Sequence, residues 1–311
     1  MEKTNQRDVP AKVTGRKIGF AAFANKVIEQ SKAVGKELTA ERYSTVLRSL
    51  MSFMGNKDVK VRDIDSGLLA GYESFLRSRG LCKNTTSFYM RNLRAIYNRA
   101  VEAGLTEQRN PFKHVYTGID KTVKRAVPLS VIRKIKEMDL DSKPSLDYAR
   151  DIFMFSFYTR GMSFIDIAYL RKKDLKGGIL TYRRKKTNQV LFVKWEKPMQ
   201  EIIDKYSDYA GPYLLPIIKN SRLDERRQYR NAEHLVNEKL KIIGQSLGLA
   251  APLTSYVARH AWASIARSKN VSISTISEAL GHDSENTTLI YVSSLDTSLV
   301  DKANSLIIKS L

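Results

Sequence analysis

The sequence predicts a mainly α-helical protein of two domains with one small antiparallel β-sheet. At roughly 100–200 residues per domain, the 311 residues suffice for two domains. Hydrophobic residues make up 42% and charged residues 27% of the chain, which fits globular domains and excludes a disordered chain. Apolar residues recur mostly at helical spacing, and strand-like alternation is confined to one stretch. No apolar run reaches the roughly 18 residues that a membrane-spanning helix needs.

The first third of the chain carries four amphipathic helical patterns, which together predict a small helical domain over residues 17–105. The patterns cover about 17–34, 39–54, 66–79 and 84–103. Thr39 is a possible N-cap of the second pattern, and the third and fourth patterns begin after Asp65 and Asn84. We expect the fourth helix to present Arg91 and Arg94 on its outer face, one turn apart, as DNA contacts.

Two segments outside this domain lack a regular pattern. Residues 1–16 are polar and are expected to form a flexible N-terminus without a secretory signal. Residues 106–127 are expected to link two domains, because Asn110-Pro111 and Gly118 interrupt any periodicity. Basic residues in this linker predict contact with a phosphate backbone, and an ordinary solvated linker is the alternative. They are Lys121, Lys124 and Arg125.

Residues 128–311 predict a second, mixed α/β domain. Pro128 is expected at the start of its first helix. The helix over about 145–160 is strongly apolar and should lie in the core, and a short helix over about 163–170 follows. Later helical patterns cover about 197–206, 232–247, 254–267, 273–280, 285–291 and 297–309.

The chain has a formal net charge of +21, and both halves share the excess of Lys and Arg. This distribution favours a protein whose two domains both touch a nucleic acid, because each neutralised phosphate releases condensed counterions. The alternative is a basic protein that is merely soluble. The single cysteine, Cys82, excludes a disulfide framework and a cysteine-rich zinc site, so we predict no metal site and a cytoplasmic location.

The segment LGHDSENTTLIYV, residues 280–292, places a histidine and a tyrosine around one predicted helix. Gly281 can reverse the chain, His282 follows on that turn, and Tyr291 lies near the far end of the next helix. A phenol there can attack a phosphorus while an imidazole donates a hydrogen bond to the oxyanion. Taken alone, the pair also fits a half-buried aromatic residue and a turn residue.

The segment TSYVARHAW, residues 254–262, predicts a helix with Tyr256 and Arg259 one turn apart on one face. A guanidinium offers parallel N–H donors that match two phosphate oxygens. Because an arginine on an otherwise apolar helix is costly unless it is paired, Arg259 predicts an anion ligand.

Alternating residues over Ile179–Arg183 and Val190–Lys194 predict a β-hairpin with a basic tip. A lysine at this tip could protonate a leaving oxygen, and a solvated run of charges is the alternative. Arg184 and Lys185 at the tip are expected to contact DNA.

With these three segments together, the chain resembles the tyrosine recombinases, also called the phage integrase family. The resemblance rests on Leu280-Gly281-His282, on the TT-x-I-Y motif that ends at Tyr291, and on the Arg259-His260 box, and it covers the whole chain. It implies a helical SAM-like core-binding domain and a catalytic domain with a three-strand sheet near its active site. Together these domains would form a C-shaped clamp on DNA.

The resemblance also implies a reaction that needs neither a metal nor a nucleotide cofactor. Tyr291 would attack the scissile phosphate and leave a 3′-phosphotyrosyl bond and a free 5′-hydroxyl. Arg259 would bind the nonbridging oxygens, His282 would support the transition state, and Lys186 would protonate the leaving 5′-oxygen.

The chain departs from the family pattern at two positions. Tyr256 stands where the family usually has a histidine, and a phenol with a pKa near ~10 is a poor base at neutral pH. Ser163 stands where the first arginine is expected, and the nearest arginine is Arg160, three residues earlier. We hypothesise that Arg160 supplies the missing guanidinium from one helical turn away. Alternatively, Arg160 is structural and the site has fewer positive charges.

The function implied is site-specific recombination of double-stranded DNA by a homotetramer that assembles from monomers on two sites, through a Holliday junction. Accessory DNA-bending proteins are conceivable partners. The reaction's direction stays open among integration, excision, inversion and resolution. The C-terminal tail, 296–311, carries apolar residues that can pack on a neighbouring protomer or on its own domain. Because the first domain begins near Lys17, an extra arm-binding domain is not expected, which favours simple inverted-repeat sites.

Two rival functions follow from the same sequence. The altered arginine and histidine positions fit a DNA-binding regulator that has kept the fold and lost the chemistry. A metal-dependent nuclease would need clustered carboxylates, and no acidic pair lies near the basic motifs.

Overall fold

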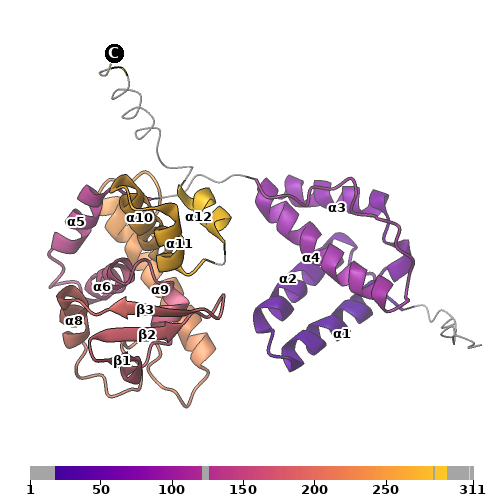
Figure 1. Ribbon diagram of the computed structural model, residues 1–311. Coiled ribbons are helices and arrows are strands. Elements are labelled where there is room, and N and C mark those ends of the chain that lie inside the picture. Colours follow the sequence, from indigo (N-terminus) through magenta and orange to yellow (C-terminus); the bar gives the residue numbers. More distant parts are fainter. Residues whose placement is uncertain (1–17, 121–125, 283, 293–307, 309–311) are drawn as a thin grey trace, which may run out of the picture. The chain divides into compact units, whose positions relative to one another are not determined.

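The chain folds into two compact units, residues 1–122 and 123–311, which we call the N-terminal and C-terminal units. The structure is a computed structural model that describes residues 18–120, 126–282, 284–292 and 308. The side chains of 286 and 290–292 lie outside the described part. Figure 1 shows the helical N-terminal unit and the mixed C-terminal unit. In the described ranges, each helix is too short or too polar to cross a membrane.

Within residues 18–120, four α-helices and a short 3-10 helix build the N-terminal unit, as the apolar periodicity predicts. They are α1 (Phe20–Ala33), α2 (Glu37–Phe53), η1 (Val61–Asp63), α3 (Ser66–Ser78) and α4 (Lys83–Glu102). Helix α3 begins after Asp65, as predicted, and the Asp65 carboxylate caps it by accepting a hydrogen bond from the Leu68 amide at 2.8 Å. Helix α4 begins at Lys83 instead of after Asn84, whose side-chain amide exchanges hydrogen bonds with the Asp120 backbone. The prediction that Thr39 caps α2 is wrong, because the helix begins two residues earlier, at Glu37.

The core of the N-terminal unit is made of apolar side chains from the inner faces of these helices, among them Phe20, Leu50, Tyr72 and Tyr97. Phe112 and Val115, from the predicted linker, are buried in the same core, so the chain follows this unit beyond the end of α4.

The C-terminal unit contains eight α-helices and three strands among its described residues. The helices are α5 (Leu129–Glu137), α6 (Pro144–Tyr158), α7 (Phe164–Ala168), α8 (Lys197–Asp204), α9 (Glu225–Ser246), α10 (Ser255–Ser268), α11 (Ile273–Leu280) and α12 (Glu285–Val292). A short 3-10 helix, η2 (Lys172–Asp174), precedes the sheet. The strands are β1 (Leu175–Lys176), β2 (Ile179–Arg183) and β3 (Val190–Lys194), in the antiparallel order β1-β2-β3.

The predicted hairpin is confirmed residue by residue, with Thr181 opposite Phe192 in its middle. Helix α9, in contrast, begins seven residues before the predicted 232. The Asp224 side chain caps it, and its first two turns are polar, so apolar periodicity could not mark them. Pro128 occupies the N-cap of α5 instead of its first helical position.

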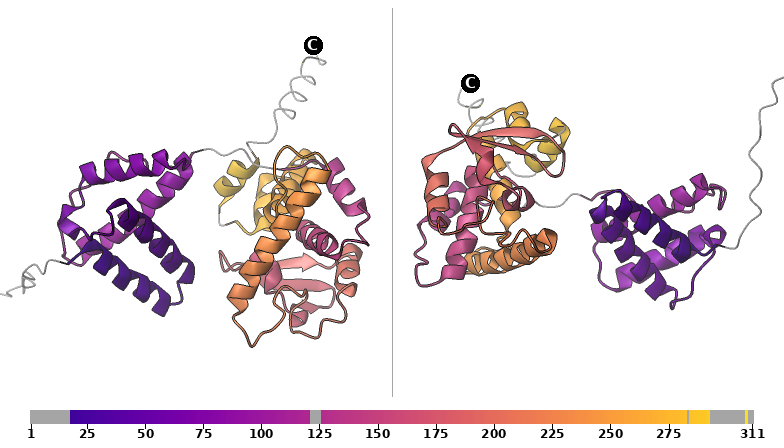
Figure 2. Two further views of the ribbon diagram at one scale, coloured as in Figure 1. Left: turned by 180° about the vertical axis from the view of Figure 1, so that it is seen from behind. Right: turned by 90° about the horizontal axis from the view of Figure 1, so that it is seen from below.

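Helix α6 forms the centre of the C-terminal unit and packs against α9 and α10 (Figure 2). Ile152, Phe153 and Phe155 on α6 are fully buried, as the apolar pattern predicts. The helix ends at Tyr158, and Arg160 and Gly161 then adopt positive φ angles of 61° and 73°. The helix therefore does not continue through Arg160 to residue 163, and Arg160 does not lie one helical turn from Ser163.

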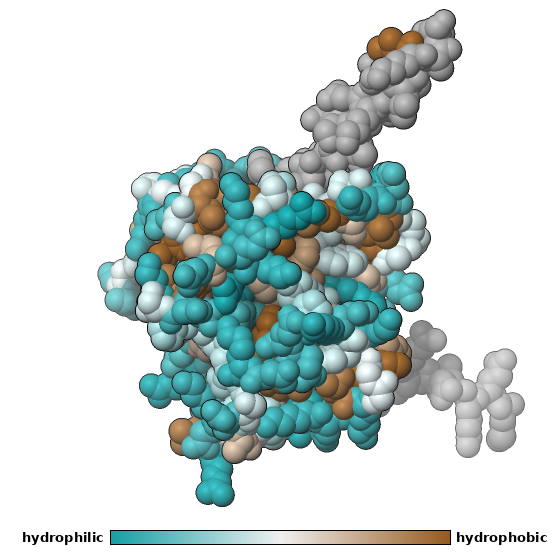
Figure 3. All heavy atoms as spheres, turned by 90° about the vertical axis from the view of Figure 1, so that its left-hand side faces the viewer, coloured by the Kyte–Doolittle hydropathy of each residue, from teal (hydrophilic) through white to brown (hydrophobic). Residues whose placement is uncertain are grey.

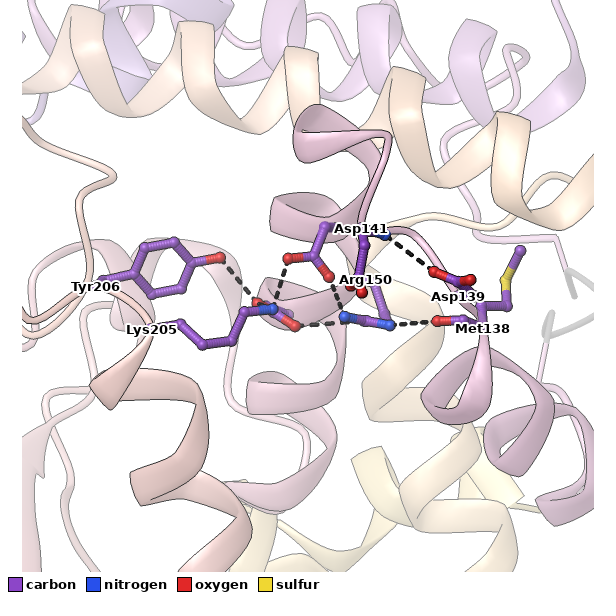
Figure 4. Close-up of polar contacts among 8 residues, drawn as sticks. Met138, Asp139, Asp141, Arg150, Lys205 and Tyr206 are labelled. Carbon is purple, nitrogen blue, oxygen red and sulfur yellow. Dashed lines mark hydrogen bonds and ion pairs between the residues drawn. The ribbon is translucent and has the colours of Figure 1, made fainter.

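A cluster of charged residues around the buried Asp151 fixes α6 to the end of α8 (Figure 4). Lys205 Nζ lies 2.5 Å from carboxylate oxygens of both Asp147 and Asp151, and Arg150 bridges the same two carboxylates. The Tyr206 hydroxyl donates to Asp151 at 2.9 Å. The face of the C-terminal unit in Figure 3 is mostly hydrophilic, with apolar residues in small separate patches.

Candidate active site

Arg259, on α10, lies at the centre of a buried polar cluster, and only 2% of it is exposed. Its Nη1 donates to the Gly161 carbonyl at 2.8 Å and its Nη2 to the Leu280 carbonyl at 2.5 Å. Its Nε has no hydrogen-bond partner among the described residues. Burial, followed by the positive charge of Arg184, lowers the pKa of Arg259 to about 10, so the guanidinium stays charged at neutral pH.

His282 follows the left-handed Gly281, which ends α11 with φ of 61°. Its Nε2 lies 3.0 Å from Arg259 Nη2, and its Nδ1 lies 2.8 Å from the Thr288 hydroxyl. Because a guanidinium nitrogen can only donate, Nε2 accepts and Nδ1–H donates to Thr288. Burial, with the charges of Arg259, Arg184 and Lys186, lowers the pKa of His282 to about 4. The imidazole is therefore neutral at neutral pH.

Tyr291 lies in α12, and its side chain is outside the described residues. The helix that carries it is nevertheless fixed beside the cluster. Thr288, three residues before Tyr291 on the same helix, is fully buried and holds the hydrogen bond to His282. Helix α12 also packs against α10 and α11.

The tip of the β2–β3 hairpin reaches the same cluster. Arg184 is 6% exposed, and its Nη1 donates to the Gly281 carbonyl. Lys186 is exposed at the tip, and its charge contributes to the low pKa of His282, which indicates that the two side chains are near each other. Sequence reasoning grouped Arg184 with the surface charges. The alternation of strand residues could have predicted that Arg184 is buried, because Leu180, Tyr182 and Arg184 share the buried face.

Asp166 ties the segment after α6 to the tip of the β2–β3 hairpin. Ser163 donates a hydrogen bond to Asp166 at 2.5 Å, and the second Asp166 oxygen accepts the Lys185 amide at 2.8 Å. Arg160 is half-buried beside this segment, and its charge opposes the rise that burial causes in the pKa of Tyr182.

Tyr256 lies one turn before Arg259 on α10 and is 47% exposed. Its ring meets the His260 ring edge-on, with 4.8 Å between the ring centroids. Tyr256 is therefore an exposed side chain of α10 one turn away from the buried Arg259.

The predicted DNA contacts fall in three places. Arg94 is exposed and Arg91 half-buried on α4, and Arg94 Nη1 donates to Thr117 at 3.2 Å. Lys185 is exposed at the hairpin tip, with its Nζ 4.3 Å from the centre of the Tyr169 ring. The predicted contacts Lys121, Lys124 and Arg125 lie outside the described residues, as do residues 1–16 and the tail 296–307 and 309–311.

Comparison with known proteins finds two family models along the chain. Residues 19–117 match the phage integrase SAM-like domain, and residues 131–298 match the phage integrase family. The tyrosine recombinase XerC of Thermodesulfovibrio yellowstonii is 25% identical over 264 residues, which cover 81% of this chain and 84% of the relative. XerC of Leptospira interrogans is 21% identical over 261 residues, 82% of each chain.

Solved structures with the same fold include two recombinases bound to DNA. The lambda integrase (75–356) dimer on a COC′ core site superposes with a TM-score of 0.68 at 15% identity, over 88% of this chain and 95% of that one. The XerH recombinase in a post-cleavage complex with palindromic difH DNA superposes with a TM-score of 0.66 at 17% identity, over 92% and 84%.

Proposed function

This chain belongs to the phage integrase family and is a tyrosine recombinase, an enzyme of site-specific DNA recombination, and from that premise we propose the roles of its residues. Tyr291 attacks the scissile phosphate, so that a 3′-phosphotyrosyl ester forms and the bond to the 5′-oxygen breaks. Lys186 gives that oxygen its proton. Attack of the 5′-hydroxyl of the partner strand on the ester reverses these steps and joins the exchanged strands.

The observation that carries this assignment is the buried guanidinium of Arg259. Two carbonyls hold it, no carboxylate pairs with it among the described residues, and its Nε lacks a partner there. A buried cation without a counterion is costly unless an anion completes the site. The nonbridging oxygens of the scissile phosphate match its remaining donors.

His282 accepts the Tyr291 proton in this proposal. The single lone pair of its neutral Nε2 accepts from Arg259 Nη2, and it can take a proton once that donor turns to the phosphate. The imidazolium that results keeps Nδ1–H on Thr288 and donates its new Nε2–H to the phosphate. Negative charge on the phosphate favours this protonated form. Tyr256 donates a hydrogen bond to a phosphate oxygen.

DNA is the partner that the basic charge and the relatives favour. Lambda integrase has been solved as a dimer on a core site and as a tetramer on a Holliday junction. We infer that this chain likewise binds double-stranded sites with both units, assembles as a tetramer on two sites, and acts in the cytoplasm. Arg91, Arg94 and Lys185 contact phosphates.

Covalent capture tests the chemistry. Inverted repeats that flank the coding region supply the candidate site, and a nick beside the cleavage point traps the phosphotyrosyl ester. The chain should form an adduct that survives denaturation, with the DNA linked to residue 291 in a mass-mapped peptide. Tyr291→Phe should bind the same duplex without forming an adduct.

Tyr148→Phe is the matched control, because it removes a phenol from α6 in the same unit and should leave the adduct unchanged. An adduct formed by Tyr291→Phe would refute the assigned nucleophile. Sequence-specific binding by the unaltered chain without any adduct would instead support the regulator.

A further inference from the structure

We propose that Arg184 supplies the second guanidinium that holds the scissile phosphate, at the hairpin tip instead of at position 163 or 160. The inference rests on the proposed function, because it adds a catalytic residue to the same reaction. The juxtaposition of Arg184, Arg259 and the Leu280–His282 turn carries it.

Both arginines bind the same turn through consecutive carbonyls. Arg259 Nη2 donates to the Leu280 carbonyl, and Arg184 Nη1 donates to the Gly281 carbonyl. The next residue is His282, whose Nε2 faces Arg259. The turn therefore holds two guanidinium groups and an imidazole together, although they come from α10, the hairpin and the end of α11.

The backbone of this turn leaves room for the Arg184 side chain. Gly281 has a φ of 61°, and a Cβ at this position would lie 3.2 Å from Arg184 Cδ and 2.9 Å from Leu191 Cδ1. The stem of Arg184 thus passes close over a glycine that also needs its left-handed conformation. A side chain at 281 would push the arginine away from the turn.

The described residues balance only part of the positive charge of the two guanidinium groups. Neither forms an ion pair with a carboxylate in the described parts of the chain, and Arg184 is one of the charges that lower the pKa of Arg259. Asp166, whose charge raises the pKa of Arg259, accepts hydrogen bonds only from the neutral Ser163 hydroxyl and Lys185 amide, so one negative charge faces two positive ones. A phosphodiester brings one negative charge, and the five-coordinate transition state brings two, so the pair matches the anion that the reaction forms.

The two alternative positions fit this role less well. The Ser163 hydroxyl is neutral and is engaged with Asp166. Arg160 is half-buried at the chain reversal after α6, and its charge acts on Tyr182 together with those of Arg259 and Arg184. The charges that lower the pKa of His282 are instead those of Arg259, Arg184 and Lys186.

Arg184→Gln tests the proposal, because glutamine removes the charge and keeps a donor for the Gly281 carbonyl. On the nicked phosphodiester duplex, we expect cleavage to fall by about 100-fold or more, as for loss of one preorganised donor to the transition state. A methylphosphonate at the scissile position carries one negative charge fewer and needs one cation fewer. On that duplex, the ratio of unaltered to variant cleavage should shrink toward one.

Arg183→Gln is the matched control. It removes the same charge from the neighbouring residue, whose exposed side chain donates to the Asn188 carbonyl, and it should cleave like the unaltered chain on both duplexes. Arg184→Lys, which keeps the charge, serves if Arg184→Gln melts early. Where Arg184→Gln folds, Arg184→Lys should cleave the phosphodiester faster than Arg184→Gln. Where Arg184→Gln does not fold, Arg184→Lys should cleave it within about tenfold of the rate of the unaltered chain.

Three results would overturn the inference. Arg184→Gln could cleave the phosphodiester like the unaltered chain, which removes Arg184 from the site. It could be equally impaired on both duplexes, which assigns Arg184 to holding the turn. If the unaltered chain forms no adduct on either duplex, the proposed function itself fails, and the inference fails with it.

Discussion

His282 shows how burial sets the state of one residue before any substrate arrives. Its imidazole lies among Arg259, Arg184 and Lys186, and its Nδ1 is bonded to Thr288. Burial and these positive charges keep it neutral. The sequence indicates which histidine takes part, because Leu280-Gly281-His282 is a contiguous motif. It cannot indicate the protonation state, since the surrounding charges come from α10 and the hairpin.

The low pKa of His282 predicts a pH-dependent stability. A folded-state pKa of about 4, against about 6.5 in the unfolded chain, means that the unfolded state binds the proton more tightly. The stability that the neutral His282 contributes to the folded state is therefore fully present above pH ~6.5 and is lost as the pH falls toward ~4. Urea unfolding of the unaltered chain should show this loss, and His282→Gln should show a shallower pH profile between those limits.

His234→Gln is the control for this measurement. The His234 side chain is 77% exposed on α9, so its removal should leave the pH profile unchanged. Equal profiles for His282→Gln and the unaltered chain would contradict the assigned burial of charge around His282.

At the scale of elements, the site depends on how α6 ends. Strands β2 and β3 and helix α11 fall where periodicity predicts, because regular elements repeat their pattern over many residues. The reversal at Arg160 and Gly161 has no such pattern, and it decides that Gly161 offers its carbonyl to Arg259. The burial of Arg184 was missed for a related reason. Four basic residues stand in a row there, and they look alike in sequence although the alternation of the strand buries one of them.

Gly161→Ala should disturb this junction. The residue has a φ of 73°, and a Cβ there would lie 2.6 Å from Arg259 Cα, a backbone atom that cannot move aside alone. We expect the strained conformation to lower the free energy of unfolding by about 1–3 kcal/mol and the close contact to lower it further. Adduct formation should also be weaker. Thermal unfolding and covalent capture measure the two effects.

Gly178→Ala isolates the contact from the strain. Gly178 has the same φ of 73°, but a Cβ there would meet nothing within 4 Å. The Gly161 variant should therefore be the less stable of the two and the only one that loses cleavage. If both variants lose equal stability and both still cleave, the close approach of Gly161 to Arg259 does not matter for the site.

At the scale of the whole molecule, charge and motifs predict different things. The net charge of +21 predicts a nucleic-acid partner but no reaction, whereas three short segments predict the family. Those segments converge in the fold because α10, the α11–α12 turn and the hairpin meet at Arg259. Which basic residues touch DNA is harder to predict, since exposed lysines and arginines look alike in sequence whether or not a phosphate lies opposite.

Salt dependence separates local phosphate contacts from overall charge. If Arg91 and Arg94 each bind a phosphate, changing both to Gln should reduce the slope of log K against log salt by about 2. The reduction should be the same on specific and unrelated duplexes, because phosphates carry no sequence.

Lys32→Gln with Arg77→Gln is the control, because it removes the same charge from the same unit, at exposed positions that already pair with Glu29 and Glu73. Since charges beyond about 10 Å are screened at 0.1 M salt, this control should keep the original slope. Equal slopes for the two double variants in a fluorescence-anisotropy titration would show that α4 contributes only to the general field of the protein.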